Sequence, residues 1–252
     1  MKIEKIKKTG SKYTLTLDNG QKIITYDNVI LKNNLLFSKK IDEKDLNKIL
    51  EDTNYYQMYN KVVNLISQRL RSEKEIREYL TKNSVLKKEQ NKIIQELKKI
   101  DLINDYKYAK AYTNDKINLS LDGPYKIQKH LEKNKIDQDI IIKVINEINQ
   151  TTIDEHLKKI ISKKTNTTIK KSEYAFKQKL TQYLINQGYS SSDIKKHLEN
   201  IHIKPSGDEM EKIYNKLQKK YDGEKLIYNL KNKLYAKGYK IEDINNFINQ
   251  KL

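Results

Sequence analysis

The strongest constraint on the fold is an internal repeat of about fifty residues. Four segments that end in a leucine can be placed under one another, and the successive leucines are 51, 53 and 50 residues apart. Each segment reads as a long helix, a second helix that ends at the leucine, and a third helix with an apolar run. The four leucines are Leu80, Leu131, Leu184 and Leu234. The sequence therefore predicts four three-helix modules in tandem.

The last two copies of the repeat match most closely, because five residues recur fifty positions later. They are Leu184, Gly188, Tyr189, Asp193 and Ile194, which correspond to Leu234, Gly238, Tyr239, Asp243 and Ile244. A glycine just beyond a helix can adopt the left-handed conformation that ends it, and the aromatic residue that follows can pack back. We therefore expect each of these glycines to end the middle helix of its module.

The N-terminal part follows a different pattern. Residues 13–26 alternate apolar and polar side chains around Asn19 and Gly20, a dipeptide that suits a type I′ hairpin. From Asp42 onward the period changes to 3.6 residues, beginning with a short helix that contains Ile49. A small antiparallel sheet is therefore expected at the start of the chain, and no second sheet after it.

The predicted fold is mainly α: tandem three-helix repeat modules in an elongated array, preceded by a small N-terminal antiparallel β-hairpin region. Three helix starts are indicated by a Ser or Thr with a Glu three residues later, the spacing of a capping box. These pairs are Ser72 with Glu75, Thr152 with Glu155, and Ser206 with Glu209. The predicted limits are 1–52 for the N-terminal region and 53–101, 102–150, 151–204 and 205–252 for the four modules.

Composition favours a chain with several small cores in series, because 37% of the residues are hydrophobic and 33% are charged. The sequence contains no Cys, which excludes disulfides and thiolate chemistry. No apolar run reaches the about 20 residues that cross a bilayer, and the first ten residues lack the apolar core of a signal peptide. We therefore expect a soluble protein of the cytoplasm.

The charge balance favours an anionic partner. Lys and Arg number 51 against 33 Asp and Glu, which gives a net charge of +18. Such an excess attracts polyanions through counterion release and long-range steering, and nucleic acid is the first candidate. The alternative is a nucleotide bias in the gene, because the chain has only three arginines and is also rich in Ile, Asn and Tyr.

The residues that usually carry catalysis are not arranged for it. The four histidines are too irregularly spaced for two of them to share a helical face over a metal ion, and the seven glycines form no phosphate-binding loop. Carboxylate pairs such as Asp42 with Asp45, or Glu73 with Glu75, stand beside lysines at predicted helix ends, where they stabilise the helix dipole. The sequence therefore predicts a protein that is not an enzyme and needs no metal or cofactor.

Two basic clusters are candidate contact sites. The first contains all the arginines of the chain, and guanidinium groups can contact a phosphate or carboxylate at two points. It consists of Arg69, Arg71, Lys74 and Arg77. The alternative interpretation is an intramolecular ladder, in which Arg77 pairs with Glu73 one turn earlier.

The second basic cluster places ammonium groups on one helical surface and the loop after it, which suits phosphate binding. It consists of Lys158, Lys159, Lys163, Lys164, Lys170 and Lys171. The alternative is a solvated helix face that contacts only water and salt. Most of the eighteen tyrosines are expected in the core, and base stacking by a few of them is the less favoured alternative.

Four motifs of this chain resemble those of the RecX family, small regulators of the RecA recombinase. They are RLRSEKEIREYL at 69–80, LINDYKYAKAY at 102–112, DGPYKIQKHL at 122–131, and the later L-x-x-x-G-Y units. The resemblance spans nearly the whole chain and includes a strand-containing N-terminal extension and a fourth module, as in longer members. Two positions depart from the family pattern: Asn104 stands before Asp105 where two acids are usual, and Lys135 replaces a glycine after the second module's middle helix.

The resemblance implies a regulator in recombination, DNA repair and the SOS response. The family binds along the groove of the RecA filament on DNA and inhibits ATP hydrolysis, strand exchange and co-protease action. The expected partners are the RecA filament and its single-stranded DNA, with no membrane partner, and the chain is expected to be a monomer. The alternative is a direct DNA-binding regulator of the helix-turn-helix type. Acidic starts of the third helices, as in EDINNFINQ at 242–250, argue against it.

Overall fold

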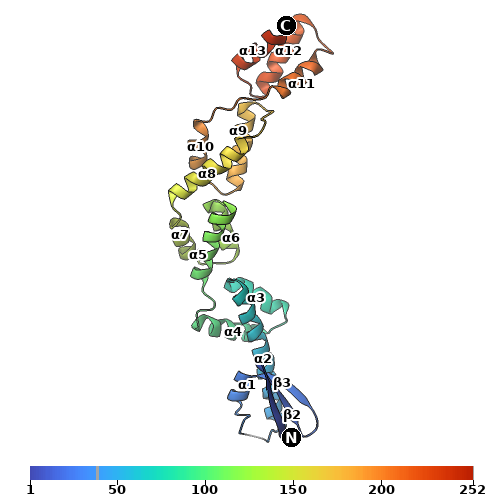
Figure 1. The fold of residues 1–252 in the computed structure, drawn as a ribbon, viewed down its shortest axis with the longest axis vertical. Helices are drawn as coiled ribbons and strands as arrows, with labels where there is room; N and C mark the ends of the chain where they lie inside the picture. Colours follow the sequence, from blue (N-terminus) through green and yellow to red (C-terminus); the bar gives the residue numbers. More distant parts are fainter. Residues whose placement is uncertain (38–39, 252) are drawn as a thin grey trace. The chain divides into compact units, whose positions relative to one another are not determined.

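The computed structural model describes residues 1–37 and 40–251, and it is mainly helical (Figure 1). Within these residues lie thirteen α-helices, one short π-helical turn and a single three-stranded antiparallel sheet at the N-terminus. The predicted fold class, mainly α with a small N-terminal sheet, is confirmed. None of the helices in the described ranges is long and apolar enough to span a bilayer.

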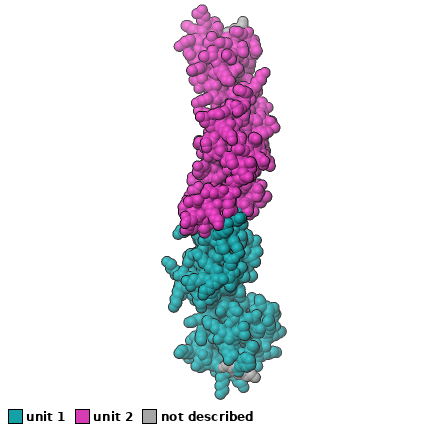
Figure 2. Space-filling model, turned by 90° about the vertical axis from the view of Figure 1, so that its left-hand side faces the viewer, with its two compact units in different colours: residues 1–111, 134–136 teal, residues 112–133, 137–252 magenta. Residues whose placement is uncertain are grey.

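The residues form two compact units (Figure 2). Unit 1 comprises residues 1–111 together with 134–136, and unit 2 comprises residues 112–133 and 137–252. The short segment 134–136 follows a helix of unit 2 in sequence but belongs to unit 1.

The N-terminal sheet contains the predicted hairpin and one further strand. Its strands are β1 (Ile3–Thr9), β2 (Lys12–Leu17) and β3 (Lys22–Tyr26), in the order β1-β2-β3. Strand β1 lacked a clear sequence signal because its register shifts between Ile3 and Lys5, which breaks the two-residue alternation. Ile3 is its only fully buried side chain.

The turn of the hairpin differs from the predicted type I′ turn. The Leu17 amide donates to the Gln21 carbonyl at 2.9 Å, so three residues, Asp18, Asn19 and Gly20, form the loop. A type I′ turn requires a positive φ at both central residues, whereas here Gly20 has φ +80° and Asn19 does not have a positive φ. The type I′ prediction was therefore wrong, although the glycine does supply the left-handed residue.

The helix predicted to be short after Asp42 is instead the longest among the described residues. Following α1 (Asp27–Lys32), α2 runs from Glu43 to Gln68, and the Asp42 carboxylate caps it by accepting from the Asp45 amide at 2.7 Å. It contains neither Gly nor Pro, so nothing in it breaks the hydrogen-bond ladder at residue 52. Its start packs on the sheet core through Ile49, while its later residues Val62 and Ile66 belong to the next core.

The remaining helices of unit 1 are α3 (Glu73–Lys82) and α4 (Lys87–Lys99), and α5 (Asp105–Asp115) runs across the division between the units. The middle of the chain continues with η1 (Lys116–Ser120), α6 (Pro124–Lys133) and α7 (Gln138–Asn146). The last two triplets are α8 (Gln150–Thr165), α9 (Glu173–Asn186) and α10 (Ser191–Glu199), then α11 (Asp208–Leu217), α12 (Gly223–Ala236) and α13 (Ile241–Lys251). Separate hydrophobic clusters lie within α8–α10 and within α11–α13. The predicted module limits themselves stay a prediction.

Of the three predicted capping boxes, one is confirmed. The Ser72 hydroxyl accepts from the Glu75 amide at 3.2 Å, and the Glu75 carboxylate accepts from the Ser72 amide at 3.1 Å. The other two were wrong. Helix α8 begins before Thr152, because the Asn149 side chain caps it, and α11 is preceded by Gly207 at φ +82° without a side-chain cap.

The two predicted helix-ending glycines are confirmed and also make a joint between helices in unit 2. Gly188 and Gly238 have φ +92° and +82°, and the tyrosines after them are buried. Beyond the end of α9, the Gln187 carbonyl accepts from the Gly123 amide at 2.7 Å, and the Gly188 carbonyl accepts from the Tyr125 amide at 3.0 Å. The amides at the start of α6 thus bond to the carbonyls that α9 leaves free.

The same joint recurs between α9 and α12. The Ser172 hydroxyl, at the start of α9, donates to the Lys237 carbonyl at 2.6 Å. Since the N-terminus of one middle helix faces the C-terminus of the next, their dipoles attract. In unit 1, the Ser72 hydroxyl at the start of α3 donates to the Asn134 side-chain oxygen at 3.2 Å. The next residue, Lys135, has φ +57°, so a lysine here takes the left-handed conformation that glycine takes elsewhere.

Candidate partner-binding surfaces

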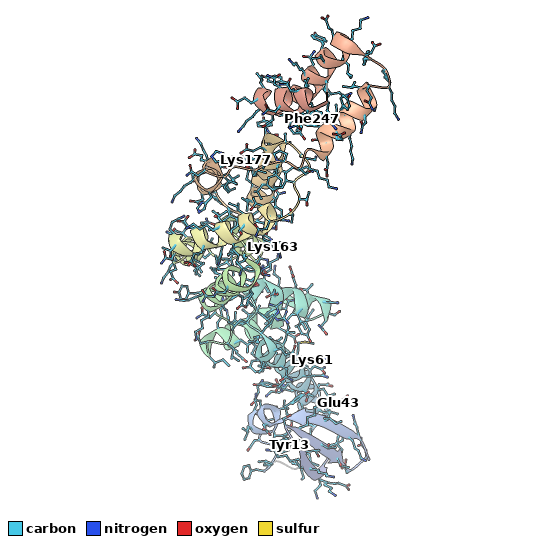
Figure 3. The ribbon with its side chains drawn as sticks, turned by 45° about the horizontal axis from the view of Figure 1, so that its top comes forward. Tyr13, Glu43, Lys61, Lys163, Lys177 and Phe247 are labelled. Atoms are coloured by element: carbon cyan, nitrogen blue, oxygen red, sulfur yellow. The ribbon has the colours of Figure 1, made fainter. Side chains whose placement is uncertain are left out.

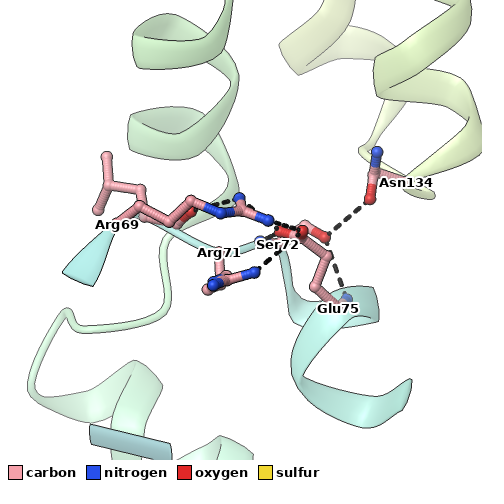
Figure 4. Close-up of polar contacts among 6 residues, drawn as sticks. Arg69, Arg71, Ser72, Glu75 and Asn134 are labelled. Carbon is pink, nitrogen blue, oxygen red and sulfur yellow. Dashed lines mark hydrogen bonds and ion pairs between the residues drawn. The ribbon is translucent and has the colours of Figure 1, made fainter. Parts of the chain in front are cut away.

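The first basic cluster lies in the connection between α2 and α3 and in the first turns of α3. Helix α2 ends at Gln68, the backbone of Arg69 is extended, and Ser72 then caps α3. This short connection brings Arg69 and Arg71 to the first turn of α3, where Glu75 points back toward them (Figure 4). The arginines are therefore positioned by the capping geometry of α3.

Glu75 binds both of these arginines. Arg69 Nη2 lies 2.5 Å from Glu75 Oε1, and Arg71 Nη1 lies 3.7 Å from the same oxygen. The Arg71 side chain is only 20% exposed, and its buried Nε has no hydrogen-bond partner among the described residues. Much of the guanidinium of Arg71 is thus directed into the protein, while Arg69 is half exposed.

Arg77 and Lys74 are also paired within the protein. Arg77 Nε lies 2.7 Å from Glu73 Oε1, which confirms the intramolecular alternative for this arginine, and Lys74 pairs with Glu78 at 3.5 Å. Lys98 adds a second cation to Glu73 at 2.5 Å. Burial opposes the charge of Glu73, but the hydrogen bonds from Lys98 and Arg77 outweigh it and hold the pKa of this carboxyl below its ordinary value.

The four residues of the first cluster therefore stand beside nearly as many acids. Glu73, Glu75 and Glu78 each pair with at least one of them. A groove of about 660 Å³ runs along this face of α3 and is lined by Lys74, Arg77 and the acids Glu73, Glu78 and Asp105, among others. The mixed charges reduce the attraction that this surface exerts on a polyanion.

The second basic cluster is more open to solvent. Lys158, Lys159 and Lys163 are exposed on α8 and form no ion pair with the side chains that the structure describes; Lys163 is labelled in Figure 3. Lys164, near the end of this helix, lies over the ring of Tyr183, 4.6 Å from its centroid.

The last two residues of the cluster precede α9. Lys170 lies 3.9 Å from Asp208, and Lys171 neighbours Lys179, whose positive charge lowers the pKa of Lys171. The structure thus brings four of the six lysines together on α8 and places the other two at the start of the next helix.

Two of the four histidines contact other side chains within the protein. His197 is largely buried, its Nδ1 lies 2.8 Å from the Asp193 carbonyl, and its Nε2 lies 3.5 Å from Asp154. His130 stacks on Tyr112 with ring centroids 3.9 Å apart. Across the described residues, no group of three or more His, Asp or Glu side chains is arranged to hold a metal ion.

Comparison with known proteins identifies relatives over the whole length. A regulatory protein RecX from Streptococcus uberis is 31% identical to this chain, and the alignment covers 99% of each protein. A regulatory protein RecX from Bacillus cytotoxicus is 30% identical, with 99% of this chain and 97% of the relative covered. The family model described as "RecX, third three-helix domain" matches residues 152–198, which correspond to α8, α9 and most of α10.

Solved structures agree with the sequence relatives. A crystal structure of a regulatory protein RecX has a TM-score of 0.66 and 26% identity, over 79% of this chain and 99% of the other. The crystal structure of RecX from Lactobacillus salivarius has a TM-score of 0.50 and 27% identity, over 58% and 97%. The resemblance indicated by the motifs is confirmed, and this chain belongs to the RecX family of regulatory proteins.

Proposed function

We propose that this protein binds the RecA nucleoprotein filament and mainly inhibits its ATPase, strand exchange and co-protease activities. The observation that carries the proposal is the similarity, over nearly the full length of both proteins, to regulatory proteins named RecX. The net charge of +18 supports it, because a filament that contains DNA presents phosphates to a cationic partner. In this proposal the protein acts by contact in the cytoplasm, as a monomer, with no cofactor and no turnover of its own.

The lysines of the second basic cluster that lie on α8, here called the α8 cluster, are the better candidate for the contact with DNA phosphates or acidic RecA side chains. Its lysines Lys158, Lys159 and Lys163 are exposed, so a polyanion can displace their counterions without first breaking an ion pair. The cluster around Arg69 can contribute through its half-exposed guanidinium. Arg71 and Arg77 would have to leave Glu75 and Glu73, or bind while still paired with them.

The test is ATP hydrolysis by RecA on single-stranded DNA, measured with increasing amounts of this protein. We expect the rate to fall, and the inhibition to weaken with added salt, because the contact is partly electrostatic. Binding to bare duplex DNA is measured at the same salt. Strong sequence-dependent duplex binding with an unchanged ATPase rate would favour the helix-turn-helix alternative, against which the acids Glu242 and Asp243 in the first turn of α13 argue.

A further inference from the structure

A groove in unit 2 combines exposed tyrosine rings with lysines. It has a volume of about 1250 Å³ and lies along α9, beside the end of α12 and the start of α13. Sites for small ligands usually measure about 300–1000 Å³, so this open groove suits a segment of a polymer. Two of its lining side chains are largely exposed: Tyr174 on α9 by 59% and Tyr235 on α12 by 66%.

The joint between α9 and α12 fixes the Tyr174 ring in this groove. An added Cβ on Gly238 would lie only 2.7 Å from Tyr174 Cδ1, so one side of the ring is packed against that glycine. The Gln178 side-chain amide donates to the Tyr174 hydroxyl at 2.6 Å. One face or edge of the ring is therefore held while more than half of the side chain stays open to a ligand.

The charged residues that line the groove are three lysines and two acids: Lys177, Lys179, Lys240, Glu173 and Asp243. Lys177, labelled in Figure 3, and Lys240 flank Glu173 at 3.0 and 3.2 Å, so this acid is neutralised by its neighbours. Lys179 also lines the groove, is exposed, and pairs with no carboxylate among the described residues. Its ammonium group is therefore open to an anion.

The groove in unit 1 supplies a comparison, because it uses the same positions when α3 and α9 are each counted from their first residue. Residues 73, 74, 77, 78, 81 and 82 of α3 line that groove, and residues 173, 174, 177, 178, 181 and 182 of α9 line this one. The ion pair of Lys74 with Glu78 in α3 is replaced in α9 by Tyr174 and Gln178. The α9 face thus has a ring where α3 has a lysine and an amide where α3 has Glu78, so the carboxylates that remain in this groove are Glu173 and Asp243.

We propose that the groove in unit 2 binds a single strand of nucleic acid, with bases against Tyr174 and Tyr235 and a phosphate at Lys179. Exposed rings and ammonium groups in one groove match the flat bases and charged backbone of a single strand. An acidic peptide would satisfy the lysines but offers no aromatic faces to the rings. The inference deepens the proposed function and rests on it for its biological meaning, since the strand would be the one in the filament.

The experiment measures the fluorescence anisotropy of a labelled oligothymidine of about fifteen nucleotides, long enough to cover one such groove. RecA is left out, so that a failure of this inference can be distinguished from a failure of the proposed function. We expect Tyr235→Ala to weaken binding about tenfold, as removal of one stacking ring does, and Tyr174→Ala to act similarly. The corresponding Phe variants should retain most of the affinity, because stacking uses the ring and not the hydroxyl.

Tyr228 provides the matched control, since it is 68% exposed on the same helix as Tyr235 but does not line the groove. Tyr228→Ala should bind the oligonucleotide like the unmodified protein. Lys179→Gln should reduce the salt slope by about 0.7, because the protein then neutralises one phosphate fewer.

Three results would overturn the inference: unchanged affinity in Tyr235→Ala, an equal loss in Tyr228→Ala, or tighter binding of a labelled polyglutamate peptide than of the oligonucleotide. Tyr235 is mostly exposed, so its variant tests the proposal even where Tyr174→Ala disturbs the joint.

Discussion

Glu75 combines two roles at the start of α3. It completes the capping box with Ser72, and it is the common partner of Arg69 and Arg71. Because the Arg71 side chain is four-fifths buried, removal of Glu75 leaves a buried positive charge without its nearest acid. A single carboxylate therefore connects the end of α2 to the start of α3.

We expect Glu75→Ala to lower the free energy of unfolding by about 1–3 kcal/mol, since it removes half of a capping box and the partner of a buried cation. Urea unfolding followed by circular dichroism measures the change. Glu78→Ala is the control on the same helix: its side chain is 65% exposed and pairs only with Lys74, so it should cost at most about 0.5 kcal/mol. Equal losses in the two variants would contradict the role assigned to Glu75.

Glu73 is expected to make the free energy of unfolding depend on pH. Its pKa in the folded protein lies below the ordinary value, so it contributes stability above the pKa of the unfolded chain, about 4.3, and this contribution is lost as the pH falls through the folded pKa. Glu73→Gln should therefore unfold more easily than the unmodified protein at neutral pH, with a difference that shrinks below about pH 4. Unfolding free energies measured from neutral pH to about pH 3 test this. A difference that stays constant with pH would contradict it.

The two joints between helices differ in how tightly their neighbours pack against the glycine. An added Cβ on Gly188 would meet the backbone nitrogen of Lys126 and the carbonyl oxygen of Gly123, neither of which can move without shifting α6. An added Cβ on Gly238 would meet the Tyr174 side chain, which is partly exposed and can rotate. Both glycines have positive φ, so the strain of the left-handed conformation is common to both.

Alanine substitutions at three glycines should therefore destabilise the protein to different and predictable extents. Gly207 has φ +82° with nothing within 4 Å, so Gly207→Ala reports the conformational cost alone, about 1–2 kcal/mol. Gly238→Ala should cost somewhat more, and Gly188→Ala the most, because only there does the methyl group meet backbone. The order is read from midpoints of urea unfolding. A loss in Gly188→Ala no greater than that in Gly207→Ala would show that the joint at α6 is not tightly packed.

Helical periodicity made the repeated helices predictable, and the glycine-tyrosine pairs made the ends of α9 and α12 predictable. The structure shows where local signals fail. The register shift in strand β1 interrupts the alternation of apolar and polar residues by which a strand is recognised. Helix α2 continues through residue 52 because no residue there stops a helix. Lys135 adopts the left-handed conformation although its side chain does not favour it. The candidate site was only partly predictable, since the pairing of Arg69 and Arg71 with Glu75 depends on how α2 is followed by α3.

The groove in unit 2 was missed for a related reason. Tyr174 and Tyr235 lie on different helices, sixty-one residues apart in sequence, and only the joint between α9 and α12 brings them to one groove. Tyrosines at helical spacing are usually core residues, and several here are, including Tyr189 and Tyr239. The exposed tyrosine at the second residue of α9, where α3 has a lysine, was the available sequence signal.

For the whole molecule, the net charge of +18 matters less than which lysines are unpaired. A cation already bound to a carboxylate releases few counterions when it meets a phosphate, whereas an exposed lysine releases its own. We therefore expect the triple variant Lys158→Gln, Lys159→Gln, Lys163→Gln to weaken inhibition of the RecA ATPase more than Arg77→Gln does, and to flatten its salt dependence. The charge-matched control replaces three exposed lysines of α12 with Gln; they are Lys225, Lys231 and Lys233. This control should inhibit the RecA ATPase like the unmodified protein. If both triple variants lose inhibition equally, total charge rather than the α8 cluster determines the contact; if neither does, the α8 cluster is not part of it.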